Sequence, residues 1–215
     1  MAKPRRFGYP IMLDLSGRRA VVVGGGEVAL RKARALAEAG AQVRVVAPKL
    51  LPEFAEDGRF ECLAERYQKR HLKGALVAVA ATDDEAVNRQ VAEDARAAGV
   101  LVNVVDRPEL CDFIVPAQVR RGDLLIAIAT GGAAPALAKR LRERLEKEFG
   151  PEHATLLEVL REVREDLKKR NVPADLRRRI FERLTEDDLL AAAHGGRKVL
   201  IQVIGKVMAD CLNNE

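Results

Sequence analysis

Three consecutive glycines, Gly24, Gly25 and Gly26, are the residues whose type and spacing most clearly suggest chemistry. They join an apolar, β-branched run at residues 18–23, which predicts a buried strand, to residues 28–39, whose apolar positions have helical spacing. A glycine turn between a strand and a helix lets the backbone approach a pyrophosphate, which the N–H groups at the helix start then bind. A tight turn without a ligand is the alternative, but the strand, turn and helix together favour a dinucleotide cofactor.

Further contacts to that cofactor are expected from the loops after the second and fourth predicted strands. The predicted cofactor-binding residues are Gly24, Gly25, Gly26, Glu27, Val28, Ala47, Pro48, Thr82 and Asp83. The acidic residue that usually binds the ribose hydroxyls of NAD is expected near Ala47 and Pro48, but none is present there. Lys49 would favour NADP instead, so the residues alone leave the choice between NAD and NADP open.

Asp106 follows the fifth predicted strand, residues 100–105, at the edge where open parallel sheets bind their ligands. A carboxylate there, preceded by Asn103, is able to exchange protons beside a nicotinamide ring. A helix cap or a turn residue before Pro108 is an equally good interpretation of the position alone.

Composition excludes several classes of function. The three cysteines are far apart, and His71, His153 and His194 are isolated, so we predict no resident metal and no disulfide framework. An aromatic content of 4% without tryptophan argues against base stacking, and we expect no nucleic-acid partner. The N-terminus does not form a secretory signal and the apolar runs are too short to cross a bilayer, so we expect a cytoplasmic protein without membrane contact.

The elements that must position these residues follow from hydrophobic periodicity. Strand-like runs occupy residues 18–23, 42–46, 60–65, 75–80 and 100–105. Helical patterns alternate with them, which indicates an α/β fold class with a Rossmann-type parallel sheet over residues 1–112.

The pattern changes after residue 112. Residues 113–119 and 124–129 predict a hairpin around residues 120–123, and residues 136–149 predict a charged helix, so residues 113–150 form a small α+β domain. Residues 151–215 form an all-helical domain, with helices predicted at residues 156–169, 174–184, 186–194 and 198–212.

Thr130, Gly131 and Gly132 precede Pro135 and make a second helix start that is able to bind an anion. A structural loop is the better interpretation unless the substrate is polyanionic. The formal net charge of +5 lies within residues 1–150, because basic and acidic residues balance in the tail, and such a surplus suits an anionic small molecule.

Several motifs, in order along the chain, resemble the precorrin-2 dehydrogenase and sirohydrochlorin ferrochelatase family, the amino-terminal half of sirohaem synthase in its stand-alone form. They are residues 22–29 with 31–33, residues 80–84 with Asn88, residues 103–108, residues 113–116, and residues 130–132 with Pro135. Residues 9–15, just before the first strand, are also similar to the family.

The resemblance implies NAD-dependent oxidation of precorrin-2 to sirohydrochlorin, and in some members insertion of ferrous iron as well. It implies NAD rather than NADP, Asp106 as the catalytic residue, and a homodimer formed by residues 113–150. Because precorrin-2 is a polycarboxylate, we expect it to bind at Asn103, Thr130, Gly131 and Gly132. A nucleotide-sensing Rossmann domain of a transport regulator is the alternative, although such domains usually keep the acidic residue after the second strand.

Overall fold

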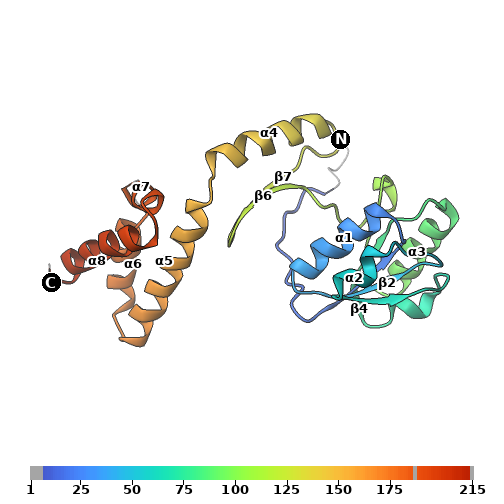
Figure 1. Cartoon of the computed structure of the whole chain (residues 1–215), viewed down its shortest axis with the longest axis horizontal. Helices are drawn as coiled ribbons and strands as arrows, with labels where there is room; N and C mark the ends of the chain where they lie inside the picture. The colour runs from blue at the N-terminus through green and yellow to red at the C-terminus, as the bar shows by residue number, and fades with distance from the viewer. Residues whose placement is uncertain (1–6, 186–187, 214–215) are drawn as a thin grey trace, which may run out of the picture. The chain divides into compact units, whose positions relative to one another are not determined.

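The computed structural model describes residues 7–185 and 188–213. The chain divides into two compact units, the first ending at Val115 and the second starting at Pro116. The elements of each unit are drawn in Figure 1. The division into three domains, with a boundary at residue 150, stays a prediction. In the structure the predicted hairpin and the helical tail lie within the same compact unit.

The first unit is built on a five-stranded parallel sheet with the order β3-β2-β1-β4-β5. The strands are β1 (Arg19–Val23), β2 (Gln42–Val46), β3 (Phe60–Leu63), β4 (Ala75–Ala80) and β5 (Leu101–Val104). The central strands β1 and β4 are short apolar runs buried from both sides, as a covered parallel sheet requires, whereas the edge strand β3 has no buried residue. The Rossmann-type α/β sheet predicted from the sequence is confirmed.

Helices cover both faces of this sheet. Helices α1 (Glu27–Glu38) and α2 (Glu53–Asp57) share one apolar cluster with alternate strand residues such as Val22 and Val45. Helix α3 (Glu85–Ala97) packs on the opposite face against Val21 and Ala78. Because successive strand residues point to opposite faces, the inner strands β1, β2 and β4 contribute to both clusters.

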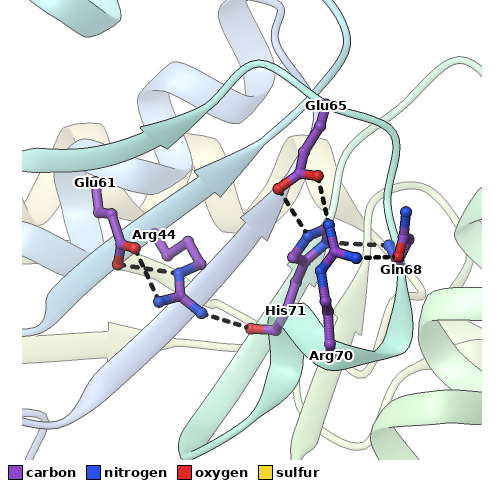
Figure 2. Close-up of polar contacts among 6 residues, drawn as sticks. All are labelled: Arg44, Glu61, Glu65, Gln68, Arg70 and His71. Carbon is purple, nitrogen blue, oxygen red and sulfur yellow. Dashed lines mark hydrogen bonds and ion pairs between the residues drawn. The ribbon is translucent and has the colours of Figure 1, made fainter.

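The loop between β3 and β4 is held by a polar network (Figure 2). His71, in the short 3-10 helix η1 (Lys69–Leu72), is 2% exposed; its Nδ1 accepts from the Gln68 backbone N–H at 3.0 Å. Its Nε2 therefore carries the proton and lies 3.2 Å from a Glu65 oxygen. Arg70 donates to the other Glu65 oxygen, and Arg44 donates to the His71 carbonyl. Since η1 directly precedes β4, the network fixes the entry of the chain into β4 and gives His71 a structural role.

The second unit begins with the antiparallel hairpin of β6 (Ala117–Arg121) and β7 (Leu124–Ile128). Its two-residue loop has Gly122 in the left-handed region, with φ +56°, so Arg120 and Arg121, which the sequence placed in the turn, extend the strand instead. The guanidinium of Arg121 donates to the carbonyls of Glu146 and Phe149, at the end of α4 (Pro135–Glu148). This capping ties the strand to the helix.

The tail consists of α5 (Glu152–Lys169), α6 (Ala174–Arg183), α7 (Asp188–His194) and α8 (Arg197–Asn213). Their apolar faces meet in one core that includes Leu167, Ile180 and Leu200. The helix predicted from residue 186 is observed from Asp188, since residues 186 and 187 lie outside the described part of the chain. Within the described residues, no helix is both long and apolar enough to cross a membrane.

Candidate cofactor and proton-transfer site

The candidate site lies where the carboxyl ends of the parallel strands meet. The chain runs outward from β1 to β3 and then returns to the other side of β1 to form β4 and β5. The order therefore reverses between β1 and β4, which is the switch point where open α/β sheets bind ligands. The loops after β1, β2, β4 and β5 all lie at this edge.

The three glycines after β1 differ in how closely the surrounding backbone packs against them. Gly24 has φ +139°, and a Cβ there would lie 2.2 Å from the carbonyl oxygen of Ala81. A Cβ on Gly25 would lie 1.9 Å from the carbonyl oxygen of Lys49. Gly26 is exposed, and a Cβ on it would meet nothing within 4 Å. Packing thus requires the first two glycines, while the third leaves open space in front of the backbone.

Helix α1 begins at that open space. Its N-cap is Gly26, and no side chain accepts a hydrogen bond from the N–H groups of its first turn, which contains Glu27 and Val28. By contrast, the Asp84 carboxylate caps α3 by accepting from the N–H groups of Ala86 and Val87. The uncapped start of α1 and the open space at Gly26 fit the pyrophosphate of a dinucleotide.

The loop after β4 is locked by Asn88, a buried residue on α3. Its side-chain oxygen accepts from the Thr82 N–H at 3.2 Å, and its amide nitrogen donates to the Thr82 carbonyl at 2.8 Å. The Thr82 hydroxyl has two acceptors within reach, the Asp84 carbonyl at 3.0 Å and the Asn88 side-chain oxygen at 2.9 Å, while Asp83 is exposed. The structure therefore holds this loop in one conformation beside the switch point.

The loop after β2 carries no carboxylate. Ala47 is buried and donates through its N–H to the Leu63 carbonyl, and Pro48 and Lys49 are exposed. This arrangement supports binding of a nicotinamide dinucleotide without distinguishing NAD from NADP.

Asp106 lies at the carboxyl end of β5, in a turn closed by the Arg107 N–H donating to the Val104 carbonyl at 3.2 Å. It is exposed and has φ +59°, a left-handed conformation that Asp and Asn adopt more readily than most residues. Asn103 is 8% exposed, and its amide nitrogen donates to the Phe113 carbonyl at 3.0 Å. Its contact with substrate stays a prediction, because that nitrogen already has a partner within the protein.

Two residues beside Asp106 were not predicted as site residues. Burial lowers the pKa of the half-buried Lys32 on α1, and the charge of Arg31 lowers it further, whereas Asp106 and Cys111 raise it. Lys32 is thus a cation within electrostatic reach of the Asp106 carboxylate. Cys111 is buried behind the same turn. Lys32 belongs to residues 31–33, one of the motifs that resemble the family. No local pattern in the sequence predicts that it senses the charge of Asp106.

Thr130, Gly131 and Gly132 lie in the second unit, before α4. Both glycines are exposed and left-handed, and the Ala133 N–H donates to the Thr130 carbonyl at 3.1 Å. No side chain caps the start of α4 at Ala134. The anion-binding role of these residues stays a prediction. Among the described residues, no group of three or more His, Cys, Asp and Glu side chains is arranged to hold a metal ion.

Comparisons with known proteins agree with this arrangement. A family profile described as NAD(P)-binding matches residues 11–117, and a profile described as sirohaem biosynthesis protein central matches residues 121–148. The solved structure of SirC, a precorrin-2 dehydrogenase, has a TM-score of 0.76 and 30% identity, and the match covers 92% of this chain and 99% of that one. The chain belongs to the precorrin-2 dehydrogenase family.

The family also includes segments of longer proteins. The siroheme synthases of Chromobacterium violaceum and Stutzerimonas stutzeri are 47% and 42% identical to this chain over 191 residues. Each match covers 87% of this chain but only 41% of the relative. The chain therefore spans well under half the length of these curated relatives.

Proposed function

We propose that this chain oxidises precorrin-2 to sirohydrochlorin with NAD, in the biosynthesis of sirohaem. The observation that carries the proposal is the placement of Asp106 at the same sheet edge as the open glycine turn at Gly26. Membership of the precorrin-2 dehydrogenase family, and the similarity to siroheme synthases, support this substrate.

The cofactor would be held by the loops after β1, β2 and β4. Gly26 and the first turn of α1 receive the pyrophosphate, while Ala47, Pro48, Thr82 and Asp83 line the adjoining loops. A bound, oxidised nicotinamide supplies a hydride acceptor. We propose NAD as the natural cofactor, although Lys49 makes NADP the necessary comparison.

Asp106 acts as the proton acceptor. Oxidation of precorrin-2 to sirohydrochlorin removes a hydride and a proton, so a base is needed beside the hydride acceptor. The Asp106 carboxylate is exposed at the strand edge, and its charge is one of the influences that raise the pKa of Lys32. Asp106 therefore takes the proton.

The substrate is a polycarboxylate, which suits an anion-binding surface. We propose that Thr130, Gly131 and Gly132 bind one of its carboxylates through the uncapped start of α4. A contact of Asn103 with the substrate stays a separate prediction for the first unit. We propose a homodimer as the functional form, because no residue of α4 is buried and Leu137 is 49% exposed.

The test is incubation of the purified chain with precorrin-2 and either NAD or NADP, while the absorbance of sirohydrochlorin is followed. We expect product with NAD and a lower kcat/KM with NADP. Absence of product with both cofactors, together with retained dinucleotide binding, would favour the alternative of a nucleotide-sensing domain.

A further inference from the structure

Cys111 lies directly behind the turn that carries Asp106. Its side chain is 4% exposed, and it follows the short 3-10 helix η2 (Pro108–Leu110) that leads away from the turn. We propose that Cys111 is a positioning residue for Asp106, because its sulfur binds the peptide groups on both sides of that residue. This inference rests on the proposed role of Asp106 as the proton acceptor.

The sulfur contacts three backbone groups around the turn. The Val104 N–H donates to Cys111 Sγ at 3.1 Å. The single thiol proton faces two carbonyl oxygens, that of Val104 at 3.2 Å and that of Arg107 at 3.3 Å. Val104 and Arg107 flank Asp106, so one side chain holds both ends of the turn.

These contacts replace a missing neighbour strand. β5 is the last strand of the sheet, so its outer backbone groups need partners from elsewhere. The Asp112 backbone N–H donates to the Val102 carbonyl, and the Asp112 carboxylate accepts from the Val102 N–H. The sulfur of Cys111 accepts from the Val104 N–H. The segment after η2 therefore completes the edge of β5 up to the point where the turn begins.

The turn needs this support because Asp106 has φ +59°. A left-handed conformation at a residue other than glycine carries a free-energy cost, and it persists only where the surrounding structure determines it. Without the sulfur contacts, the segment from Val104 to Arg107 is free to relax to an ordinary conformation. The Asp106 carboxylate would then move away from its position at the strand edge.

Three substitutions separate this role from simple packing. Cys111→Ser keeps a donor and an acceptor, Cys111→Ala removes both, and Cys111→Val fills the volume without either. Two quantities are measured for each: kcat for oxidation of precorrin-2 at saturating cofactor, and amide hydrogen exchange of residues 104–107. Cys62→Ala, which removes an exposed cysteine of the same unit, is the matched control.

We expect Cys111→Ala and Cys111→Val to lower kcat about ten-fold, since a displacement of about 1 Å costs up to about 100-fold and the turn keeps its backbone hydrogen bond. Exchange at residues 104–107 should accelerate in both, and Cys111→Ser should lie closer to the wild type in both measurements. The KM for the cofactor should not change, since the glycine turn is untouched. A variant that merely loses stability would accelerate exchange at residues 77–80 of β4 as well.

The inference is overturned if Cys111→Val matches the wild type in kcat and exchange, or if Cys111→Ser is as impaired as Cys111→Ala. General acceleration of exchange throughout the sheet would also overturn it, because Cys111 would then serve packing alone. If the wild-type chain does not oxidise precorrin-2, the proposed function fails, while exchange at residues 104–107 still decides whether the sulfur holds the turn.

Discussion

At the residue scale, the chemistry depends on how a few side chains are presented at one edge of the sheet. Asp106 is exposed there in a left-handed turn, Lys32 supplies a nearby positive charge, and Gly26 leaves its backbone accessible. Two substitutions test the proton acceptor and the cofactor turn separately.

Replacement of Asp106 by Asn should remove the proton acceptor without disturbing the turn, because Asn also tolerates a positive φ. We expect the rate of precorrin-2 oxidation to fall about 100-fold or more, the range typical of a lost general base. Cofactor affinity and the thermal midpoint should remain those of the wild type. Glu93→Gln, an exposed change on α3, is the control, and wild-type turnover by Asp106→Asn would remove Asp106 from the mechanism.

Gly26→Asp should prevent cofactor binding without unfolding the chain. The backbone at Gly26 has φ −95°, which any residue adopts, and a Cβ there meets no atom within 4 Å. The added carboxylate would repel a pyrophosphate, so we expect the affinity for the reduced cofactor to fall at least about ten-fold, or ~1.4 kcal/mol. Fluorescence titration measures this effect.

Gly24→Ala provides the contrast, since its Cβ would clash with the Ala81 carbonyl at 2.2 Å and lower the thermal midpoint. Wild-type affinity in Gly26→Asp would show that the cofactor binds elsewhere.

At the element scale, ion pairs attach the helices on one face of the sheet to each other. The Asp57 carboxylate, at the end of α2, accepts from Arg59 and, at 2.8 Å, from Arg34 on α1. The pKa of Asp57 is lowered from 3.8 to about 2. The hydrogen bond from Arg59 makes the largest contribution to this shift, followed by the hydrogen bond from Arg34. These contacts fix α2 against α1 beside the loop that follows β2.

Asp57→Asn should therefore destabilise the chain in a pH-dependent way. Because the pKa of Asp57 is lower in the folded chain than in the unfolded chain, its ion pairs stabilise the fold above pH 3.8. This stabilisation is lost as the pH falls toward about 2. Urea unfolding should show a lower free energy of unfolding for Asp57→Asn at pH 7, and a smaller difference from the wild type at pH 3. A difference that does not change with pH would contradict this account.

At the scale of the whole molecule, the apolar surface of the second unit is consistent with assembly. Helix α4 packs on the hairpin, yet none of its residues is buried, and Leu137 is half exposed. Burying Leu137 between two copies would remove apolar surface from water and so contribute free energy to a dimer.

Leu137→Arg should therefore weaken the homodimer. We expect sedimentation equilibrium to give a dimer for the wild type and a dissociation constant at least about ten-fold higher for Leu137→Arg, since a charge would be buried at the interface. Val199→Arg places the same charge at a 41% exposed position on α8 and should leave the dimer intact. A monomeric wild type, or equal effects of both changes, would exclude α4 from the interface.

Local signals in the sequence determined the strands, most helices and the glycine turn. The apolar, β-branched run at residues 20–23 is buried on both faces of the sheet, and such a run predicts a strand without knowledge of the fold. Gly24 was expected in a tight turn, and the positive φ confirms it. The hairpin was expected at this place, but its turn starts two residues later than predicted, because Arg120 and Arg121 still pair with β7 and Arg121 also bonds to the end of α4, a contact that no local pattern reveals.

Only the tertiary structure decided which residues surround Asp106. Lys32 comes from a distant position in the chain and senses the charges of Asp106 and Cys111, while Cys111 returns to the turn through η2 and contacts the Arg107 carbonyl. The Asn103 amide donates to the Phe113 carbonyl inside the protein. The sequence alone does not show whether an asparagine side chain bonds to the protein in this way or faces a ligand. Periodicity reports which face of an element is apolar, whereas contacts between distant elements depend on strand order and packing, which no short stretch of sequence contains.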